Sequence, residues 1–209
     1  MKSNTIQHMR SEIVFDVETK KMFSDVASDD PGLLGVSIVS VLRRVVDDNN
    51  EKVSEDLQSY WEKDFDSLWS LFTTADRIIG FNTLKFDIPA LRPYTAIDLE
   101  KLHHLDIMEL VRQKVGRKLS LNALAQETLG NTKIDQGSNA VLYWAKGDPV
   151  SLAKLRKYCE ADVLLTRDLY DFGKEHGYMK YKDKLNDTIR VEVDFSYPAK
   201  KEKSQIGLF

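Results

Sequence analysis

Asp16 and Glu18 are two carboxylates separated by one residue, at the end of the alternating stretch SEIVFDVE at residues 11–18. In a β-strand, residues two apart point to the same side of the sheet, so both carboxylates leave this strand together. Two acids placed in this way can bind a hard divalent cation through their oxygen atoms. The pair is also common where a strand ends in solvent, and taken alone it favours that simpler explanation.

A third carboxylate, Asp162, lies on the apolar face of the most regular helical pattern in the chain. The pattern predicts a helix over about residues 150–174. An ionised carboxylate on a buried face is costly unless a cation or hydrogen-bond donors meet it. Asp162 therefore fits either a cation site or a cap or salt bridge at the edge of the face. The residues of this face recur at intervals of three and four: Leu155, Tyr158, Asp162, Leu165, Leu169 and Phe172.

A fourth carboxylate, Asp87, belongs to the segment GFNTLKFDIP at residues 80–89. An Asp just before a helix that carries Pro in its first turn is an ordinary N-cap. The functional alternative is that the start of the helix projects Asp87 at the end of the sheet. Asn82, on the preceding turn, would then be available to a ligand.

The elements that must position these side chains follow an order typical of an α/β domain with a mixed sheet. In open α/β sheets, ligands bind at the carboxyl ends of strands, which is where Asp16 and Glu18 lie. One helix should contain Phe65 to Phe72, with Asp64 or Asp66 as its cap. Strands are predicted over residues 11–18, 33–46, 51–58, 76–82 and 105–108, and further helices over residues 86–91 and most of the chain from there to Gly177, with a break near residues 130–138.

The composition excludes several classes of protein. The 209 residues fit one domain, and 30 Lys and Arg against 33 Asp and Glu give a net charge of −3. This charge excludes binding to nucleic acid by bulk positive charge alone, but not an enzyme that recruits cations and meets nucleic acid through a local patch. The single Cys159 excludes a disulfide framework. With no signal peptide at its start and no apolar run long enough to span a bilayer, we expect a soluble cytoplasmic protein without membrane partners.

Together, the acids and the tyrosine occur in the order Asp-x-Glu, Asn-x₃-Phe-Asp and Tyr-x₃-Asp, within residues 15–19, 80–87 and 158–162. In this order the chain resembles the DEDD 3′–5′ exonucleases of the ribonuclease H-like fold, tyrosine subclass. The histidine subclass would place His where this chain has Lys157. Over about residues 11–180, the chain looks most like the exonuclease domain of B-family DNA polymerases and its stand-alone bacterial relatives.

The resemblance implies a ribonuclease H-like mixed five-stranded sheet flanked by helices, and a site that holds two divalent ions, Mg²⁺ or Mn²⁺. Ions about 3.5–4 Å apart would bind the scissile phosphate between them. Asp16 would bridge both ions. Glu18 and Asp162 would complete one site, and Asp87 would bind the second ion through water. Tyr158 would orient the attacking water, because a phenol is a poor base at neutral pH.

The same resemblance implies that single-stranded or frayed DNA 3′ ends are the substrate and nucleoside 5′-monophosphates the product. Asn82 and Phe86 would position the terminal nucleotides, and Thr19 would contact the phosphate or the last base. Two alternatives stay open: a 3′–5′ exoribonuclease with the same site, and a non-catalytic module that binds 3′ ends. The stretch YMKYKDK at residues 178–184 could contact single strands, although a solvated face explains it slightly better.

The C-terminal residues differ in composition from the rest. We expect a domain at residues 1–195, a flexible linker at residues 196–204 and a separate peptide, QIGLF, at residues 205–209. The peptide resembles the short bacterial sliding-clamp-binding motif, with Gln205, Leu208 and Phe209 as its anchors. A tethered peptide of this kind implies the sliding clamp as a partner in replication or repair, near the nucleoid.

Three other residue types are assigned structural roles. We expect Cys159 to be a packing residue and His103 and His104 to be structural. Asp106, on the fifth predicted strand, could approach the site from behind, but a surface or edge role is the simpler expectation.

Overall fold

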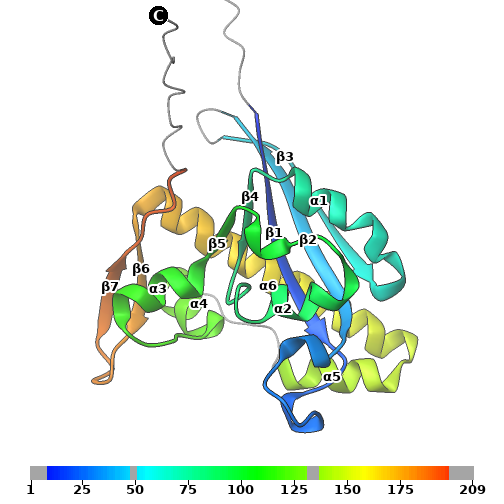
Figure 1. Ribbon diagram of the computed structural model, residues 1–209. Helices are drawn as coiled ribbons and strands as arrows, with labels where there is room; N and C mark the ends of the chain where they lie inside the picture. Colours follow the sequence, from blue (N-terminus) through cyan, green and yellow to red (C-terminus); the bar gives the residue numbers. More distant parts are fainter. Residues whose placement is uncertain (1–8, 48–50, 131–136, 198–209) are drawn as a thin grey trace, which may run out of the picture.

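The computed structural model describes residues 9–47, 51–130 and 137–197, and its centre is a mixed five-stranded sheet flanked by helices (Figure 1). This is the α/β architecture expected from the sequence. The strand order is β3-β2-β1-β4-β5. Antiparallel pairing joins β1 to β2 and β2 to β3, and parallel pairing joins β1 to β4 and β4 to β5. The bounds are β1 Arg10–Thr19, β2 Val36–Val46, β3 Lys52–Trp61, β4 Arg77–Gly80 and β5 His104–Asp106.

Helices cover both faces of this sheet. The long helix α6 crosses one face, against β1 and β2, while α1 and α2 lie on the other side of β1 (Figure 1). None of the helices in the described part of the chain is long and apolar enough to cross a membrane. The bounds are α1 Trp69–Thr74, α2 Asp87–Leu91, α3 Ile107–Val115, α4 Leu121–Leu129, α5 Gly137–Lys146 and α6 Pro149–His176.

Strand β1 is buried on both faces because both helical layers pack on it. Phe15 faces α1, where its ring meets Phe72 edge-on with centroids 4.9 Å apart. Val14 belongs instead to the cluster under α6, with Val163 and Leu169. Since alternate residues share a face, Asp16 and Glu18 lie on the α6 side of the sheet, at the end of the strand.

Helix α6 begins and ends as its sequence dictates. Asp148 caps it by accepting hydrogen bonds from the backbone N–H groups of Val150 and Ser151, and Pro149 occupies the first helical position. Gly177 ends it with a positive φ of 74°. The predicted buried face is confirmed from Leu155 to Leu169, but Phe172 is only partly buried and packs on the rings of His176 and Tyr178.

Several predicted bounds were wrong for local reasons. Residues 31–33 form a 3₁₀ turn capped by Asp30, so β2 begins only at Val36. Helix α1 follows a 3₁₀ segment, Glu62–Ser67, and its N-cap is Leu68, without a side-chain hydrogen bond; neither Asp64 nor Asp66 caps it. Ile107 and Met108 belong to α3 rather than to the fifth strand. The helix break expected at residues 130–138 falls largely outside the described residues.

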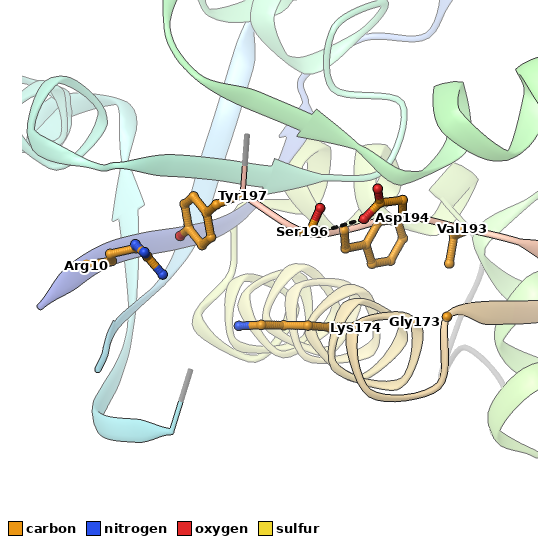
Figure 2. Close-up of a pocket in the computed structure, with 9 residues that line it drawn as sticks. Arg10, Gly173, Lys174, Val193, Asp194, Ser196 and Tyr197 are labelled. Atoms are coloured by element: carbon orange, nitrogen blue, oxygen red, sulfur yellow. Dashed lines mark hydrogen bonds between the residues drawn. The ribbon is translucent and has the colours of Figure 1, made fainter. Parts of the chain in front are cut away.

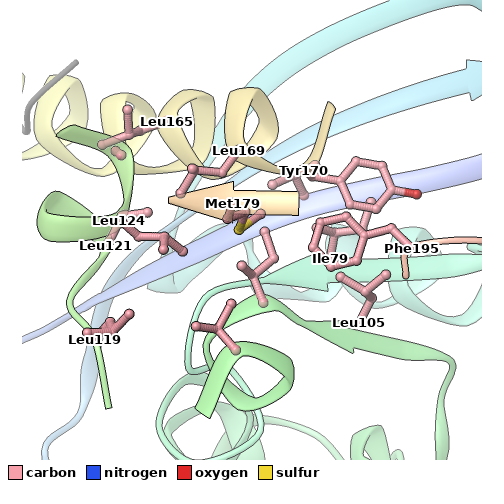
Figure 3. Packing of buried hydrophobic residues seen from close by; sticks show 14 of the residues in the cluster. Ile79, Leu105, Leu119, Leu121, Leu124, Leu165, Leu169, Tyr170, Met179 and Phe195 are labelled. Atoms are coloured by element: carbon pink, nitrogen blue, oxygen red, sulfur yellow. The ribbon is translucent and has the colours of Figure 1, made fainter. Parts of the chain in front are cut away.

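A hairpin that the sequence did not predict follows α6. Its strands, β6 Tyr178–Lys182 and β7 Thr188–Glu192, pair antiparallel, and β6 packs on α4. Met179 is fully buried in the cluster under α6 (Figure 3). The stretch that we read as a solvated face is therefore a strand with one buried residue.

The chain then returns to the start of β1. Phe195 stacks on Tyr170 with ring centroids 5.5 Å apart. Ser196 and Tyr197 lie at the start of the segment expected to be a linker, yet both contact the domain: Arg77 donates to the Ser196 carbonyl, and the Tyr197 hydroxyl donates to Glu12 at 2.6 Å. Figure 2 shows this segment passing beside α6, with Tyr197 close to Arg10. Residues 198–209, including the peptide at 205–209, lie outside the described residues.

A buried ion pair anchors this end of the sheet. Glu12 and Arg44 are direct cross-strand partners on β1 and β2, and Arg44 Nε donates to Glu12 Oε2 at 2.7 Å. Tyr170 donates to the other oxygen of Glu12 at 2.9 Å. Burial acts to raise the pKa of Glu12, but Arg44 and the Tyr197 hydroxyl outweigh it and hold that pKa below its usual value. Glu12 is therefore an ionised group inside the fold.

Candidate active site

The site is built at the carboxyl ends of the parallel strands. Strand β4 pairs with β1 only from Glu12 to Val14. Past that point the edge of β1 is open to other groups, and the backbone N–H of Val17 donates to Asp87 Oδ1 at 3.0 Å. Asp87 is 3% exposed and opens helix α2. This hydrogen bond places Asp87 next to the strand segment that carries Asp16 and Glu18.

Helix α6 supplies the remaining predicted residues. The Cys159 thiol donates to the Asp16 backbone carbonyl at 3.4 Å and lies 3.7 Å from Asp16 Oδ2. One ligand atom each of Asp16, Glu18 and Cys159 lies within 4.8 Å of the others. Tyr158 and Asp162, on neighbouring turns of α6, are 4% and 3% exposed. The structure thus brings Asp16 and Glu18 together with the α6 turn that holds Tyr158.

The electrostatics of Tyr158 reflect this crowding. Burial raises the pKa of its phenol, and the carboxylates of Asp162, Glu18 and Asp16 raise it further, since each opposes a second negative charge nearby. Tyr158 also forms a side-chain hydrogen bond with Asp162. The hydroxyl is therefore protonated at neutral pH, and it is close enough to three of the predicted acids to sense their charges.

The donor set fits a hard divalent ion better than a soft one. Burial, with the charges of Asp16 and Glu18, raises the pKa of the Cys159 thiol well above its usual value, so without a bound ion it is a neutral thiol. The carboxylates of Asp16 and Glu18 offer oxygen atoms at close range. Oxygen ligands of this kind suit Mg²⁺ and Mn²⁺, whereas thiolates select softer metals. Cys159 itself is fully buried, in agreement with a packing role.

The three residues expected to hold the substrate have different environments. Thr19 is 8% exposed, and its hydroxyl donates to the carbonyl of Lys21 at 2.9 Å. Asn82 has a positive φ of 67°, and its buried side-chain oxygen has no hydrogen-bond partner in the part of the chain that the structure describes. The ring of Phe86 contacts Phe23 edge-on, with centroids 6.1 Å apart. Of these three residues, Asn82 is the one whose side-chain oxygen has no hydrogen-bond partner among the described residues.

Asp106 was expected to have a surface or edge role, and the surface part of that expectation was wrong. It lies on the edge strand β5 but is only 3% exposed, and its carboxylate accepts hydrogen bonds from three backbone N–H groups. A signal was present: Asp106 and Glu109 have the Asp-x-x-Glu spacing of a capping box. His104 fits its structural assignment, because its Nε2 lies 2.7 Å from the Leu99 carbonyl oxygen.

Two cavities in the described part of the chain lie away from the acids. One, of about 260 Å³, is lined by Arg10, Lys174 and Tyr197 among others (Figure 2). Another, of about 540 Å³, is lined by Arg44 and Asp171 among others. Both are at the first residues of β1, whereas Asp16 and Glu18 are near its last. The acids are thus not part of either cavity.

Comparisons with known proteins agree with this architecture. The family B DNA polymerase from the hyperthermophilic archaeon Pyrobaculum calidifontis is similar in structure, with a TM-score of 0.53 and 18% sequence identity. The similarity covers 78% of this chain and 24% of the polymerase, so the chain spans about a quarter of that protein. At this identity the likeness establishes the fold alone. No curated protein matches the chain. Residues 13–172, most of the chain, match the family model RNase_H_2, and the protein therefore belongs to the RNase H superfamily.

Proposed function

We propose that this protein is a metal-dependent 3′–5′ exonuclease of the DEDD tyrosine subclass, which releases nucleoside 5′-monophosphates from single-stranded or frayed DNA. The observation that carries the proposal is the hydrogen bond from Val17 N–H to Asp87 Oδ1. This hydrogen bond joins the Asp-x-Glu motif on β1 to the Asn-x₃-Phe-Asp motif at the start of α2, which lie far apart in sequence. The two motifs meet where Tyr158 of α6 lies close to the acids. Three separate segments thus converge with the residue types that phosphodiester hydrolysis requires.

The acids would hold the metal ions, and the fit of their oxygen atoms supports this role. Asp16, Glu18, Asp87 and Asp162 would be the ligands, from β1, α2 and α6. Two bound divalent ions would neutralise the phosphate charge and lower the pKa of a water molecule. Hydrolysis then adds water across the terminal phosphodiester: the water oxygen bonds to phosphorus, the P–O3′ bond breaks, and the leaving O3′ ends protonated.

Tyr158 would orient the attacking water rather than deprotonate it. Its pKa is raised by burial and by the neighbouring carboxylates, so it holds its own proton through the reaction. A protonated phenol can accept a hydrogen bond from water while donating its own to a carboxylate, and Asp162 is such a partner. Asn82, with a side-chain oxygen left without a partner among the described residues, would bind the terminal nucleotide together with Phe86 and Thr19.

DNA is placed before RNA because the motifs of the chain resemble those of the exonuclease domain of B-family DNA polymerases. A 3′–5′ exoribonuclease with the same acids is the first alternative, and discrimination would depend on the space around the 2′ position. A non-catalytic module that binds 3′ ends is the second. The presence of all four acids and Tyr158 favours an enzyme over this module.

Recruitment by a sliding clamp is a separate part of the proposal. Gln205, Leu208 and Phe209 would bind the clamp, with the residues after Tyr197 as tether. This would place the enzyme in bacterial DNA replication or repair, in the cytoplasm near the nucleoid. The motif lies outside the described residues, so the support is the sequence alone.

The test is a digestion of 5′-labelled single-stranded DNA and RNA of one sequence, with Mg²⁺, with Mn²⁺ and with EDTA. We expect a metal-dependent ladder that shortens from the 3′ end, faster on DNA, and no ladder with Asp16→Ala. A faster ladder on RNA would select the exoribonuclease. Tight binding of 3′ ends without cleavage, insensitive to EDTA, would select the binding module.

A further inference from the structure

We infer that Asp106 is a positioning residue that holds the turn between β4 and α2, and through that turn sets where Asp87 meets β1. The inference rests on the proposed function, because Asp87 belongs to the proposed site. Asp106 does not touch the reacting atoms in this scheme. Its effect passes through the backbone of residues 82–87.

The hydrogen bonds of Asp106 are directed mainly at this turn. Its Oδ1 accepts from Asn82 N–H at 2.9 Å, and its Oδ2 accepts from Leu84 N–H at 3.1 Å. A third bond, from Glu109 N–H to Oδ1 at 3.2 Å, caps α3. A residue whose only role was to cap α3 would need the third bond alone. Asp148 offers the contrast, because its carboxylate accepts from Val150 and Ser151, within its own helix.

The turn leads directly to Asp87. Asn82 sits in the left-handed region with φ 67°, a conformation that Asn tolerates better than most residues. Its carbonyl accepts from Phe86 N–H at 3.0 Å, and the carbonyl of Thr83 accepts from Ile88 N–H at 2.9 Å. The turn therefore fixes the residues on both sides of Asp87. Asp87 in turn accepts a hydrogen bond from the backbone N–H of Val17, on β1.

The turn also packs closely on the strand before it. A Cβ built on Gly80 would lie 2.1 Å from Cγ2 of Thr83, so no larger residue fits at that position without moving the turn. Gly80 is the register partner of Asp106 in the β4–β5 pair. The carboxylate of Asp106 thus reaches the turn from the adjacent strand, while the lack of a side chain at Gly80 lets Thr83 of the turn pack on β4.

Both oxygens of Asp106 act as acceptors, which makes a carboxylate necessary at this position. In Asp106→Asn, one oxygen could still accept from Asn82 and Glu109, but an amide NH₂ would face the N–H of Leu84. Asp106→Ala would remove all three acceptors. The two variants should therefore form a graded series.

The experiment follows the amide of Val17 by NMR hydrogen exchange, in the full-length protein without substrate. If Asp106 holds Asp87 in place, exchange at Val17 should rise roughly tenfold or more in Asp106→Ala and less in Asp106→Asn. Asp148→Ala is the matched control, since it also loses a helix-capping carboxylate. It should lower the melting temperature without changing exchange at Val17.

Calorimetric titration with Mn²⁺ supplies a second readout that does not depend on turnover. The affinity for the second Mn²⁺ ion, which Asp87 would bind, should fall about tenfold in Asp106→Ala. A loss of this size is typical when a residue that supports a metal ligand is removed. Asp148→Ala should bind Mn²⁺ as the wild type does. If Asp106→Ala does not fold, Asp106→Asn decides both readouts.

The outcomes separate the two proposals. Wild-type exchange at Val17 and wild-type Mn²⁺ binding in a folded Asp106 variant would overturn the positioning role, even if the protein is an exonuclease. A wild-type protein without nuclease activity, but with faster Val17 exchange in Asp106→Ala, would overturn the proposed function and leave the positioning role in place.

Discussion

The thiol of Cys159 lies 3.4 Å from the backbone carbonyl of Asp16 and 3.7 Å from its carboxylate. A short, fully buried side chain therefore sets the spacing between α6 and the end of β1. Tyr158 is its neighbour on the helix, so the same contact fixes how close the phenol comes to the acids.

Enlarging the side chain of Cys159 should move the Tyr158 phenol away from the acids. Cys159→Leu adds methylene groups to a closed contact, and we expect a loss of about 1–3 kcal/mol in stability together with loss of nuclease activity. Cys159→Ala should keep Mg²⁺-dependent activity within about threefold, because a neutral thiol is a poor ligand for Mg²⁺. Urea unfolding and digestion rates measure both effects. Loss of activity in Cys159→Ala as complete as in Asp16→Ala would make the thiol a metal ligand.

Removing a proposed metal ligand should abolish turnover without unfolding the protein. We expect no detectable digestion by Asp16→Ala or Asp162→Ala. In metal-free buffer, Asp162→Ala should melt at a higher temperature than the wild type, since a buried carboxylate among other acids is costly without a cation. Asp168→Ala, a more exposed acid on the same helix, is the control and should retain activity. Wild-type rates in both site variants would refute the assignment.

The pH profile should show that Tyr158 is not a base. Its pKa is raised by burial and by Asp162, Glu18 and Asp16, so its ionisation lies above that of a free phenol, near pH 10. The pH profile of nuclease activity should therefore show no rise or fall below about pH 10 that depends on Tyr158. Tyr158→Phe should lower kcat about a hundredfold, the low end for a positioned group, with an unchanged profile shape. A limb near neutral pH that disappears in Tyr158→Phe would contradict this role.

Stability at low pH should depend on Glu12. The folded-state pKa of Glu12 is lowered, so the unfolded chain binds its proton first as pH falls. The stabilisation that ionised Glu12 contributes is complete above its pKa in the unfolded chain, about 4.5. It declines as the pH falls through its lower pKa in the folded protein. Glu12→Gln should lose about 3 kcal/mol at pH 7, because the buried guanidinium of Arg44 then keeps only its more exposed partner, Asp171.

Urea unfolding from about pH 3 to pH 7 measures this effect. The difference between Glu12→Gln and the wild type should shrink toward the acid end of that range. Asp30→Asn is the control, because its pair with Arg92 is exposed and should contribute little at any pH. A difference that is constant with pH would mean that Glu12 is not ionised in the fold.

Deleting residues 205–209 should separate recruitment from hydrolysis. We expect unchanged digestion of short oligonucleotides and loss of retention on an immobilised bacterial sliding clamp. Replacing Leu208 and Phe209 together by Ala should have the same effect, while replacing Lys200 and Lys201 should not. Equal retention of the truncated and full-length chains would exclude the peptide as the clamp-binding element.

Much of the fold and the candidate site could be predicted because the informative segments are periodic. Alternation in residues 11–18 indicated β1 and the shared side of Asp16 and Glu18, and the spacing from Leu155 to Leu169 indicated α6 and its buried face. Those two periodicities place carboxylates on surfaces that must be buried, which is where a charge needs a partner.

The rest could not be predicted because its partners are distant or belong to the backbone. Asp106 binds N–H groups of a turn, and these carry no side-chain signature. Glu12 and Arg44 are adjacent only once the register of β1 on β2 is known. Residues 178–184 were read as a solvated face, because they interleave Tyr and Lys without alternating, and in β6 only Met179 is fully buried. In β7, Ile189 and Val191 do alternate with polar residues, a signal that the sequence argument did not use.

The anchor of Tyr197 on Glu12 connects the end of the described chain to the first residues of β1, whereas the acids lie at its last residues. A ten-residue strand is about 33 Å long. The described chain therefore ends at the opposite end of β1 from the acids. A molecule bound at Tyr197 itself would be separated from a nucleic-acid end in the site by about the length of that strand.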